Sequence, residues 1–190
     1  MKGETMGKYS ARNEQAPHIV ADDDPSAIAL LKREHHRFRD LFDKARDAEG
    51  TELVSIAREL CMRLEVHMTI EEELLYPALK AVIGADEVDE GIVEHDAGKK
   101  LIVEIENLDG TEELYAAKVH VLGEQTIHHI DEEDGELFED GKKAHAAGKV
   151  DLDALGKAMR DRQAELYGEI LETGDQGETE EADAEEIPTA

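Results

Sequence analysis

The chain has 190 residues, which is enough for one domain with room for flexible ends, and it contains no tryptophan and three phenylalanines. Its 48 aspartates and glutamates outnumber 21 lysines and arginines, and the net charge of -27 repels nucleic acid and anionic membranes, so we exclude both as partners. No apolar run approaches the roughly 18 residues that cross a bilayer, and the single cysteine, Cys61, excludes an internal disulfide framework, so we expect a cytoplasmic protein.

The chain begins with a segment that we expect to be disordered, residues 1–24, because it has no apolar period. Asp24 and Pro25 then indicate a helix start, with the aspartate as N-cap and the proline in the first helical position. The apolar period predicts a helix over residues 25–48, which Gly50 ends.

Three further long helices follow from the same period and from a capping residue before each. We predict them over residues 51–82, 87–108 and 112–138, with Thr51, Asp86 and Thr111 as the caps. Pro77 lies late in the first of these three, where it should kink or shorten the final turns because proline lacks a backbone N–H. Residues 139–150 are predicted to be a connector.

A fifth helix is predicted to begin at Asp151 or Asp153 and to end near residue 173. Residues 174–190 are acidic and low in complexity, so we expect them to be disordered. Short connections between the first four helices favour antiparallel neighbours. The predicted fold is all-α, an antiparallel up-down-up-down four-helix bundle within residues 25–173, with an additional C-terminal helix on its outside or at one end.

The most informative stretch lies in the second predicted helix, where His67 and Glu71 stand four residues apart. Four residues advance a helix by about 400° and about 6 Å, so both side chains leave the same face one turn apart. That face also carries Leu60, Leu64 and Leu74, which makes it apolar. A buried, unpaired carboxylate is costly enough that it takes up a proton or binds a cation.

A second His-x-x-x-Glu pair, His129 and Glu133, lies in the fourth predicted helix. Each of the four helices in fact places one histidine in its apolar seam, at His35, His67, His95 and His129. A lone seam histidine is more often a hydrogen-bonded core residue, but one on every helix together with two carboxylates indicates metal ligands that converge in the bundle core.

Two of these histidines have a histidine neighbour, so a choice is needed. His35 lies in line with the apolar seam of its helix, whereas His36 lies among charged residues. His129 shares a face with apolar residues, whereas His128 lies on a wetter face. We select His35 and His129, and a register shift of one residue would exchange His129 for His128.

The types of ligand in this cluster limit which metal ions it can bind. Imidazole and carboxylate ligands suit iron, zinc, manganese or copper, and the absence of thiolates argues against an iron–sulfur cluster or a structural zinc site. Two carboxylates among four imidazoles can bridge two metal ions. The di-iron carboxylate proteins of ferritin type use Glu-x-x-His instead, so this pattern differs from theirs.

The pattern over residues 26–172 resembles the hemerythrin-like family, the histidine-histidine-glutamate cation-binding domains. The matching pieces are Leu-Leu-Lys-Arg-Glu-His ending at His35, His67-x-x-x-Glu71 followed by Leu-Leu-Tyr-Pro, Val93-Glu94-His95, and Val121-Leu122-Gly123-Glu124 leading to His129-x-x-x-Glu133. The resemblance implies a non-heme di-iron centre with oxo or hydroxo and carboxylate bridges. The ligands that it implies are His35 and His67 on one iron, His95 and His129 on the other, and Glu71 and Glu133 as bridges.

Two departures bear on function. Oxygen-carrying members of the family place a further histidine one turn after the third-helix ligand, where this chain has Lys99, and they use an aspartate in place of Glu133. The resemblance therefore implies a protein that binds or senses oxygen, peroxide or nitric oxide rather than a simple oxygen carrier. A peroxide-decomposing di-iron enzyme and an iron store or sensor without turnover are the alternatives, and the residues do not choose among them.

Overall fold

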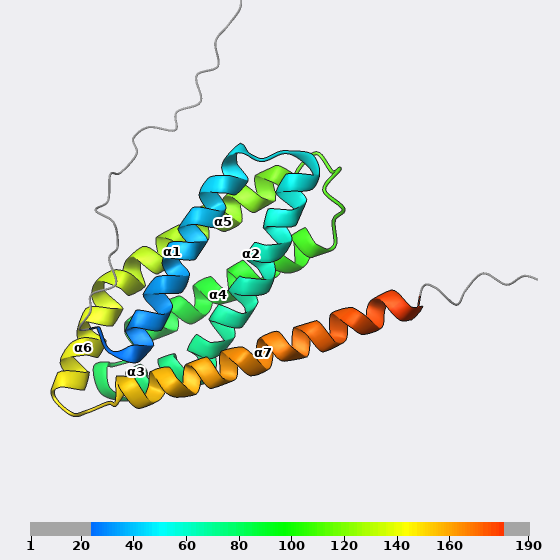
Figure 1. Ribbon diagram of the computed structural model, residues 1–190. Helices are drawn as coiled ribbons and strands as arrows, with labels where there is room; N and C mark the ends of the chain where they lie inside the picture. The colour runs from blue at the N-terminus through cyan, green and yellow to red at the C-terminus, as the bar shows by residue number, and fades with distance from the viewer. Residues whose placement is uncertain (1–23, 181–190) are drawn as a thin grey trace, which may run out of the picture.

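Every regular element between residues 24 and 180, the part of the chain that the computed structural model describes, is helical (Figure 1). The long helices are α1 (Ser26–Asp47), α2 (Gly50–Ile70), α4 (Asp86–Glu106), α5 (Tyr115–Glu132) and α7 (Leu152–Glu180). Two short helices, α3 (Tyr76–Ile83) and α6 (Phe138–Ala146), follow two π-helical turns, η1 (Glu71–Leu75) and η2 (Glu133–Leu137). The all-α prediction is confirmed, and none of the described helices is long and apolar enough to cross a membrane.

Four of the long helices form a closed group. Helix α1 packs against α2 and α5, and α4 packs against the same two helices (Figure 1). Helix α7 crosses this group along α1 and α2, and its C-terminal end extends away from the other helices in Figure 1. It reaches Glu180, whereas the sequence predicted its end near residue 173. Residues 1–23 and 181–190, which make up most of the segments predicted to be disordered, lie outside the described residues.

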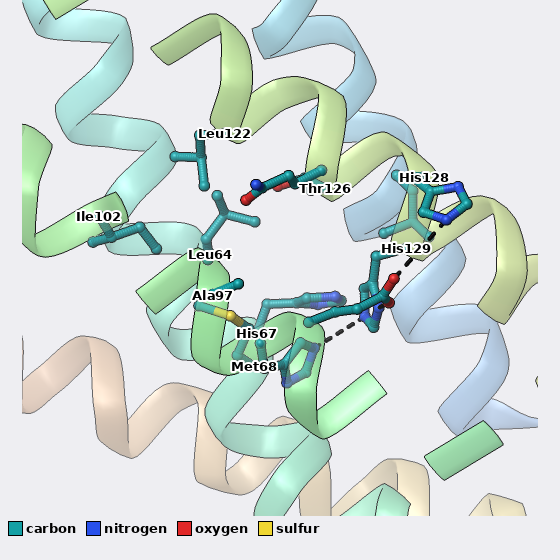
Figure 2. A pocket seen from close by; sticks show the side chains of 14 residues that line it. Leu64, His67, Met68, Ala97, Ile102, Leu122, Thr126, His128 and His129 are labelled. Carbon is teal, nitrogen blue, oxygen red and sulfur yellow. Dashed lines mark hydrogen bonds and ion pairs between the residues drawn. The ribbon is translucent and has the colours of Figure 1, made fainter. Parts of the chain in front are cut away.

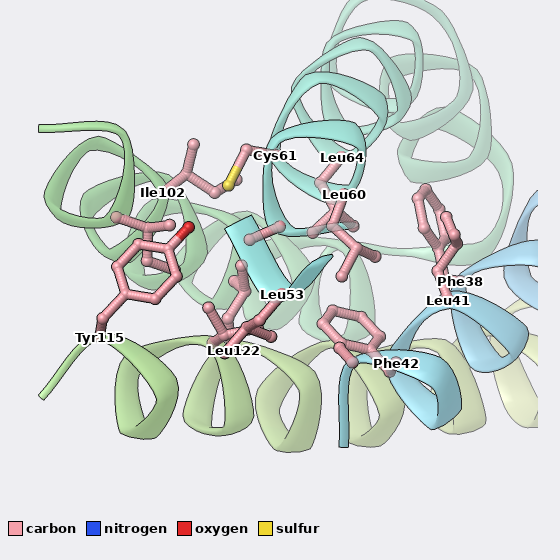
Figure 3. Close-up of a cluster of buried hydrophobic side chains, with 14 of the residues drawn as sticks. Phe38, Leu41, Phe42, Leu53, Leu60, Cys61, Leu64, Ile102, Tyr115 and Leu122 are labelled. Atoms are coloured by element: carbon pink, nitrogen blue, oxygen red, sulfur yellow. The ribbon is translucent and has the colours of Figure 1, made fainter. Parts of the chain in front are cut away.

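The apolar core consists of two clusters with a polar layer between them. One cluster surrounds Phe38, Leu64 and Leu122 (Figure 3), and the other surrounds Leu31 and Phe138. In α1, α2 and α4, the predicted site histidine lies between a residue of one cluster and a residue of the other, and His129 lies between Leu122 of α5 and Leu137 of η2. The two clusters therefore hold the four histidines at a common depth in the bundle.

The predicted connector over residues 139–150 is wrong, because most of it is helical. Helix α6 continues the fourth predicted helix past η2 and buries Phe138 and Ala144. Its polar side chains pair along the helix, with the Lys143 ammonium 2.6 Å from the Asp140 carboxylate. The helix ends before Gly148, whose φ of +69° is readily adopted by glycine alone. The segment lacks a long apolar period because its exposed charges surround a short apolar face.

The predicted caps also differ from the structure: Thr51 and Asp86 lie just inside α2 and α4, whose N-cap positions are Glu49 and Ala85. The starts of α5 and α1 differ as well. Helix α5 begins at Tyr115 instead of residue 112, since Thr111 donates both its backbone N–H and its hydroxyl to Asp109 in a turn. At the start of α1, Pro25 occupies the N-cap position, and the Ser26 backbone N–H and hydroxyl donate to Asp153 of α7, at 2.8 and 3.0 Å. A carboxylate distant in sequence thus accepts a hydrogen bond from the first turn of α1 and ties the two helices together.

Candidate metal centre

The six residues predicted as ligands lie together in the polar layer between the two apolar clusters. They are almost inaccessible to solvent, with exposed fractions of 0% for His35, 1% for His67, 0% for Glu71, 3% for His95, 7% for His129 and 3% for Glu133. The neighbours that we rejected are exposed, with side-chain fractions of 62% for His36 and 67% for His128. Figure 2 shows His128 and His129 leaving the same helix in different directions.

The six residues form two metal-sized groups that share a carboxylate. One group is His35, His67, Glu71 and Glu133, and the other is Glu71, His95 and His129. The two oxygens of Glu71 face different histidines, with Oε1 3.3 Å from His67 Nε2 and Oε2 3.5 Å from His95 Nε2. Glu71 therefore stands between the two groups, the position that a bridging carboxylate requires.

Glu133 occupies a similar position on the opposite side. Its Oε2 lies 3.3 Å from His35 Nε2 and 3.6 Å from His129 Nε2, so one oxygen faces a histidine of each group. Its Oε1 accepts a hydrogen bond of 2.9 Å from the Tyr76 hydroxyl. Both glutamates thus connect the two halves of the cluster.

Each of the four histidines is held from behind by a carboxylate. The Nδ1 donors and their acceptors are His35 with Asp134 at 2.9 Å, His67 with Glu34 at 3.0 Å, His95 with Glu72 at 2.9 Å and His129 with Glu94 at 2.7 Å. An ionised carboxylate only accepts hydrogen bonds, so each Nδ1 carries a hydrogen and each Nε2 is turned toward the centre of the cluster. Histidines that ligate metals are oriented in this way.

These four acids form a ring around the bundle. Glu34 of α1 holds the histidine of α2, Glu72 of η1 holds that of α4, Glu94 of α4 holds that of α5, and Asp134 of η2 holds that of α1. Our sequence analysis missed all four. A signal was present, because each acid is the immediate neighbour of a predicted ligand, but sequence adjacency does not reveal which helix an acid contacts.

The inward-facing atoms lack partners within the described part of the protein. Five of them are buried without a hydrogen bond, namely Nε2 of His35 and His67, both oxygens of Glu71, and Oε2 of Glu133. In addition, the Nε2 atoms of His95 and His129 lie 3.0 Å apart, and two lone pairs face each other at that distance unless a proton or a cation lies between them. Buried polar atoms without partners are costly, so this donor set fits bound metal ions.

The two central carboxylates differ in charge. Burial raises the pKa of Glu71 well above its ordinary value of 4.5, and the nearby Glu133 and Glu34 raise it further. Burial also opposes ionisation of Glu133, but His129 and His35 outweigh it and lower the pKa of that carboxyl. In the absence of metal the pair therefore keeps a proton on Glu71, since two carboxylates at this separation resist joint ionisation.

The histidines also titrate differently. Burial lowers the pKa of His67 and of His95, which keeps both rings in the neutral form that binds metal. Burial acts in the same direction on His35, but Asp134 and Glu133 more than compensate and raise its pKa to about 9. A metal ion held by His35 would have to displace this proton, so its affinity at this position should fall as the pH is lowered.

A π-helical turn begins at each central glutamate. Turn η1 starts at Glu71 and runs into Pro77, whose ring would collide with the carbonyl four residues earlier in a regular α-helix. The Tyr76 N–H donates instead to the Glu71 carbonyl, five residues back, and the wider turn accommodates the proline. Turn η2 starts at Glu133 without a proline, so the two halves share the turn although their sequences differ.

The residue after each π turn is aromatic and touches the cluster. Phe138 stacks on His35 with ring centroids 5.7 Å apart, whereas the Tyr76 hydroxyl lies 3.2 Å from His95 Nε2. Gly91 provides the space for Tyr76, because a Cβ there would lie 2.9 Å from the phenolic oxygen. The cluster therefore has an apolar ring on one half and a hydroxyl group on the other.

A cavity of about 240 Å³ adjoins the half of the cluster that contains His95 and His129. Its wall includes Met68, Ile102 and Leu122 and is mainly apolar (Figure 2). Lys99, one turn after His95, does not enter the cluster, because its ammonium group donates to both oxygens of Glu72 at 2.6 Å. The lysine thus supports the acid that holds His95.

The family model for the hemerythrin HHE cation-binding domain matches residues 26–140, which is more than half of the chain. No curated protein and no solved structure matches the chain. The matched range contains all six clustered residues and the four acids behind them. The chain therefore belongs to the hemerythrin HHE cation-binding domain family.

Proposed function

We propose that the buried cluster binds two iron ions, with His35 and His67 on one, His95 and His129 on the other, and Glu71 and Glu133 between them. The observation that carries this proposal is the convergence of four Nε2 atoms and two carboxylates on one buried centre. Two carboxylates that each face a histidine of both groups favour two ions over one. We include the antiparallel up-down-up-down order of α1, α2, α4 and α5 in the proposal, because short links join α1 to α2 and the α3 helix to α4.

The function that we infer for this centre is the binding or sensing of oxygen, peroxide or nitric oxide. Bound iron would supply the affinity and the redox chemistry for such ligands. The chain supplies a mainly apolar cavity against His95 and His129, large enough for a diatomic molecule or peroxide. Lys99 is held by Glu72, so this half of the cluster presents two imidazoles where oxygen carriers present a third.

Peroxide decomposition is a second candidate, and Tyr76 favours it. Burial, together with Glu133 and Glu71, raises the pKa of Tyr76, so its hydroxyl keeps its proton at every physiological pH. The hydroxyl donates to Glu133 at 2.9 Å and lies 3.2 Å from His95, so it would donate its hydrogen bond to a small ligand that displaced the Glu133 acceptor in this half of the centre. An iron store or sensor would need no such donor. The cytoplasmic location expected from the single cysteine also belongs to this proposal.

Metal analysis and absorption spectra test the proposal. We expect about two irons per chain after anaerobic reconstitution, and spectra of the reduced protein that change on separate addition of oxygen, peroxide and nitric oxide. One zinc and no iron would contradict it. Tyr76→Phe should keep the iron and the binding of nitric oxide; if peroxide breakdown is the function, the variant should turn over peroxide more slowly than the wild type.

A further inference from the structure

A second cluster of potential metal ligands lies at the protein surface next to the buried centre. Its members are Glu94 on α4 and His128 and Glu132 on α5, whose ligand atoms all lie within 4.8 Å of one another. His128 Nε2 is 3.4 Å from Glu132 Oε1 and 4.0 Å from Glu94 Oε1. One imidazole and two carboxylates from two helices suit a divalent transition-metal ion.

Glu94 connects this outer cluster to the buried one. Its Oε2 accepts the hydrogen bond from His129 Nδ1, while its Oε1 faces His128. An ion at the outer cluster can use Oε1 and leave the hydrogen bond to His129 intact. Occupation of the outer cluster is therefore compatible with a filled inner centre.

A second observation links the two clusters. A cavity of about 150 Å³ is lined by Glu94 and Glu132 of the outer cluster and also by His129, Glu133 and Tyr76 of the inner one. Glu133 is 3% exposed, and its Oε2, which has no hydrogen-bond partner, faces His35 and His129, so the wall of this cavity borders the buried centre. The exposed part of the wall adds the carboxylates of Glu87, Glu90 and Glu136. A cleft lined by one sign of charge concentrates the opposite ion, here a cation.

We propose that Glu94, His128 and Glu132 form an outer divalent-cation site from which ions pass through the acidic cavity to the buried centre. The passage rests on the proposed function, because it requires metal in the buried cluster, whereas the outer site does not. The ion would exchange its outer ligands for Glu133 and His129. The site stays exposed, so its ion exchanges with solvent while ions in the buried centre are retained.

The chain provides a matched control for this proposal. His36 and Asp40 form another exposed pair at i and i+4, with 3.7 Å between Nε2 and the carboxylate. No third ligand joins that pair, and it belongs to no metal-sized group within the described residues. The test compares His128→Ala/Glu132→Gln with His36→Ala/Asp40→Asn, since each double variant removes one exposed imidazole and one exposed carboxylate.

The first measurement counts ions at equilibrium. The full-length protein is stripped of metal and dialysed against Co²⁺, and cobalt is counted per chain before and after gel filtration. We expect the wild type and the control variant to hold one more ion than His128→Ala/Glu132→Gln before filtration, and all three proteins to hold the same number afterwards. Equal cobalt in all three before filtration would overturn the outer site.

The second measurement follows loading by rapid mixing of the stripped proteins with Fe²⁺ without oxygen. We expect His128→Ala/Glu132→Gln to fill the buried centre at least about tenfold more slowly than the control, because it loses its cation-concentrating entrance, and to reach the same final iron content. An unchanged rate, or a lower final content, would overturn the passage. A third outcome separates the two proposals. If the wild type retains no ion after gel filtration, but before filtration holds one more cobalt ion than His128→Ala/Glu132→Gln, the outer site stands and the proposed function fails.

Discussion

At the scale of single residues, Glu71 is the carboxylate that most needs a cation. It is fully buried, neither of its oxygens has a hydrogen-bond partner among the described residues, and Glu133 lies nearby. Direct coordination would offset its charge, whereas the metal-free protein must keep it protonated. If Glu71 coordinates a metal ion as we propose, the stability of the bundle should depend on metal and on pH.

We predict that Glu71→Gln weakens or abolishes metal binding and stabilises the metal-free protein. Because the pKa of Glu71 is raised in the folded protein, this carboxyl ionises at a lower pH, near 4.5, in the unfolded chain. The wild type therefore loses stability as the pH rises from that value toward the pKa of the folded protein. The variant has no such loss, and the difference between them should grow by about 1.4 kcal/mol for each pH unit in this window. Thermal unfolding with chelator at several pH values measures it; a variant less stable than the wild type at pH 8 would contradict the prediction.

A second prediction tests the choice between adjacent histidines. His35→Ala and His129→Ala should each lose at least one iron from the reconstituted protein, because each removes a buried Nε2 of the cluster. His36→Ala and His128→Ala should keep the retained iron, since both rings are exposed. Elemental analysis after gel filtration measures the content. Loss of retained iron in His128→Ala but not in His129→Ala would mean that His128 is the inner ligand.

At the scale of elements, the contact between α7 and the start of α1 is the closest approach of backbone atoms to a glycine among the described residues. A Cβ on Gly156 would lie 2.4 Å from the Ala27 nitrogen and 2.5 Å from the Ser26 carbonyl carbon, both of which are backbone atoms that cannot rotate aside. The hydrogen bonds from Ser26 to Asp153 lie beside this contact. Helix α7 is therefore held by a backbone-to-backbone fit as well as by side chains.

We predict that Gly156→Ala destabilises the protein by about 1–3 kcal/mol, because the added methyl group forces the two helices apart. Gly168→Ala in the same helix is the matched control. Nothing lies within 4 Å of a Cβ at Gly168, so the alanine should stabilise the helix by roughly 0.5–1 kcal/mol. Denaturant unfolding measures both changes. Equal stabilities for the two variants would show that the helices accept a methyl group at Gly156 without loss of stability.

At the scale of the whole molecule, charge dominates. The negative charges of a chain with a net charge of -27 repel one another in the folded state, and the two carboxylates of the buried centre belong to that excess. The ring of acids behind the histidines is part of this excess, and it is balanced locally, for example by Arg39, whose guanidinium lies 3.3 Å from Asp134. The remaining surface charge is open to screening by salt.

We predict that the melting temperature rises by several degrees between about 0.01 M and about 0.15 M salt, as the Debye length falls from about 30 Å to about 8 Å. Sodium chloride and potassium chloride should act equally at equal ionic strength, because screening does not depend on which cation is used. Calorimetry of the metal-loaded protein measures the shift. An unchanged or lower melting temperature would show that self-repulsion does not limit stability.

The sequence by itself determined the features that are local along a helix. The apolar period located the four long helices, and the four-residue spacing of His67 and Glu71 placed both side chains on one buried face, as the structure also has them. The same periodicity correctly separated buried His35 and His129 from their exposed neighbours. Such spacings follow from helix geometry and need no knowledge of the neighbouring helices.

Tertiary structure alone decided which residues meet across helices. Glu34 and His67 are 33 residues apart, His35 and Asp134 are 99 apart, and the carboxylate of Asp153 reaches the first turn of α1 from 127 residues away. The position of the Tyr76 hydroxyl depends equally on the packing of α4 at Gly91. A hydrogen bond of this kind depends on how two packed helices are rotated and at what depth they meet. Many residues of both apolar clusters determine that rotation and depth together, so no local sequence pattern predicts the hydrogen bond.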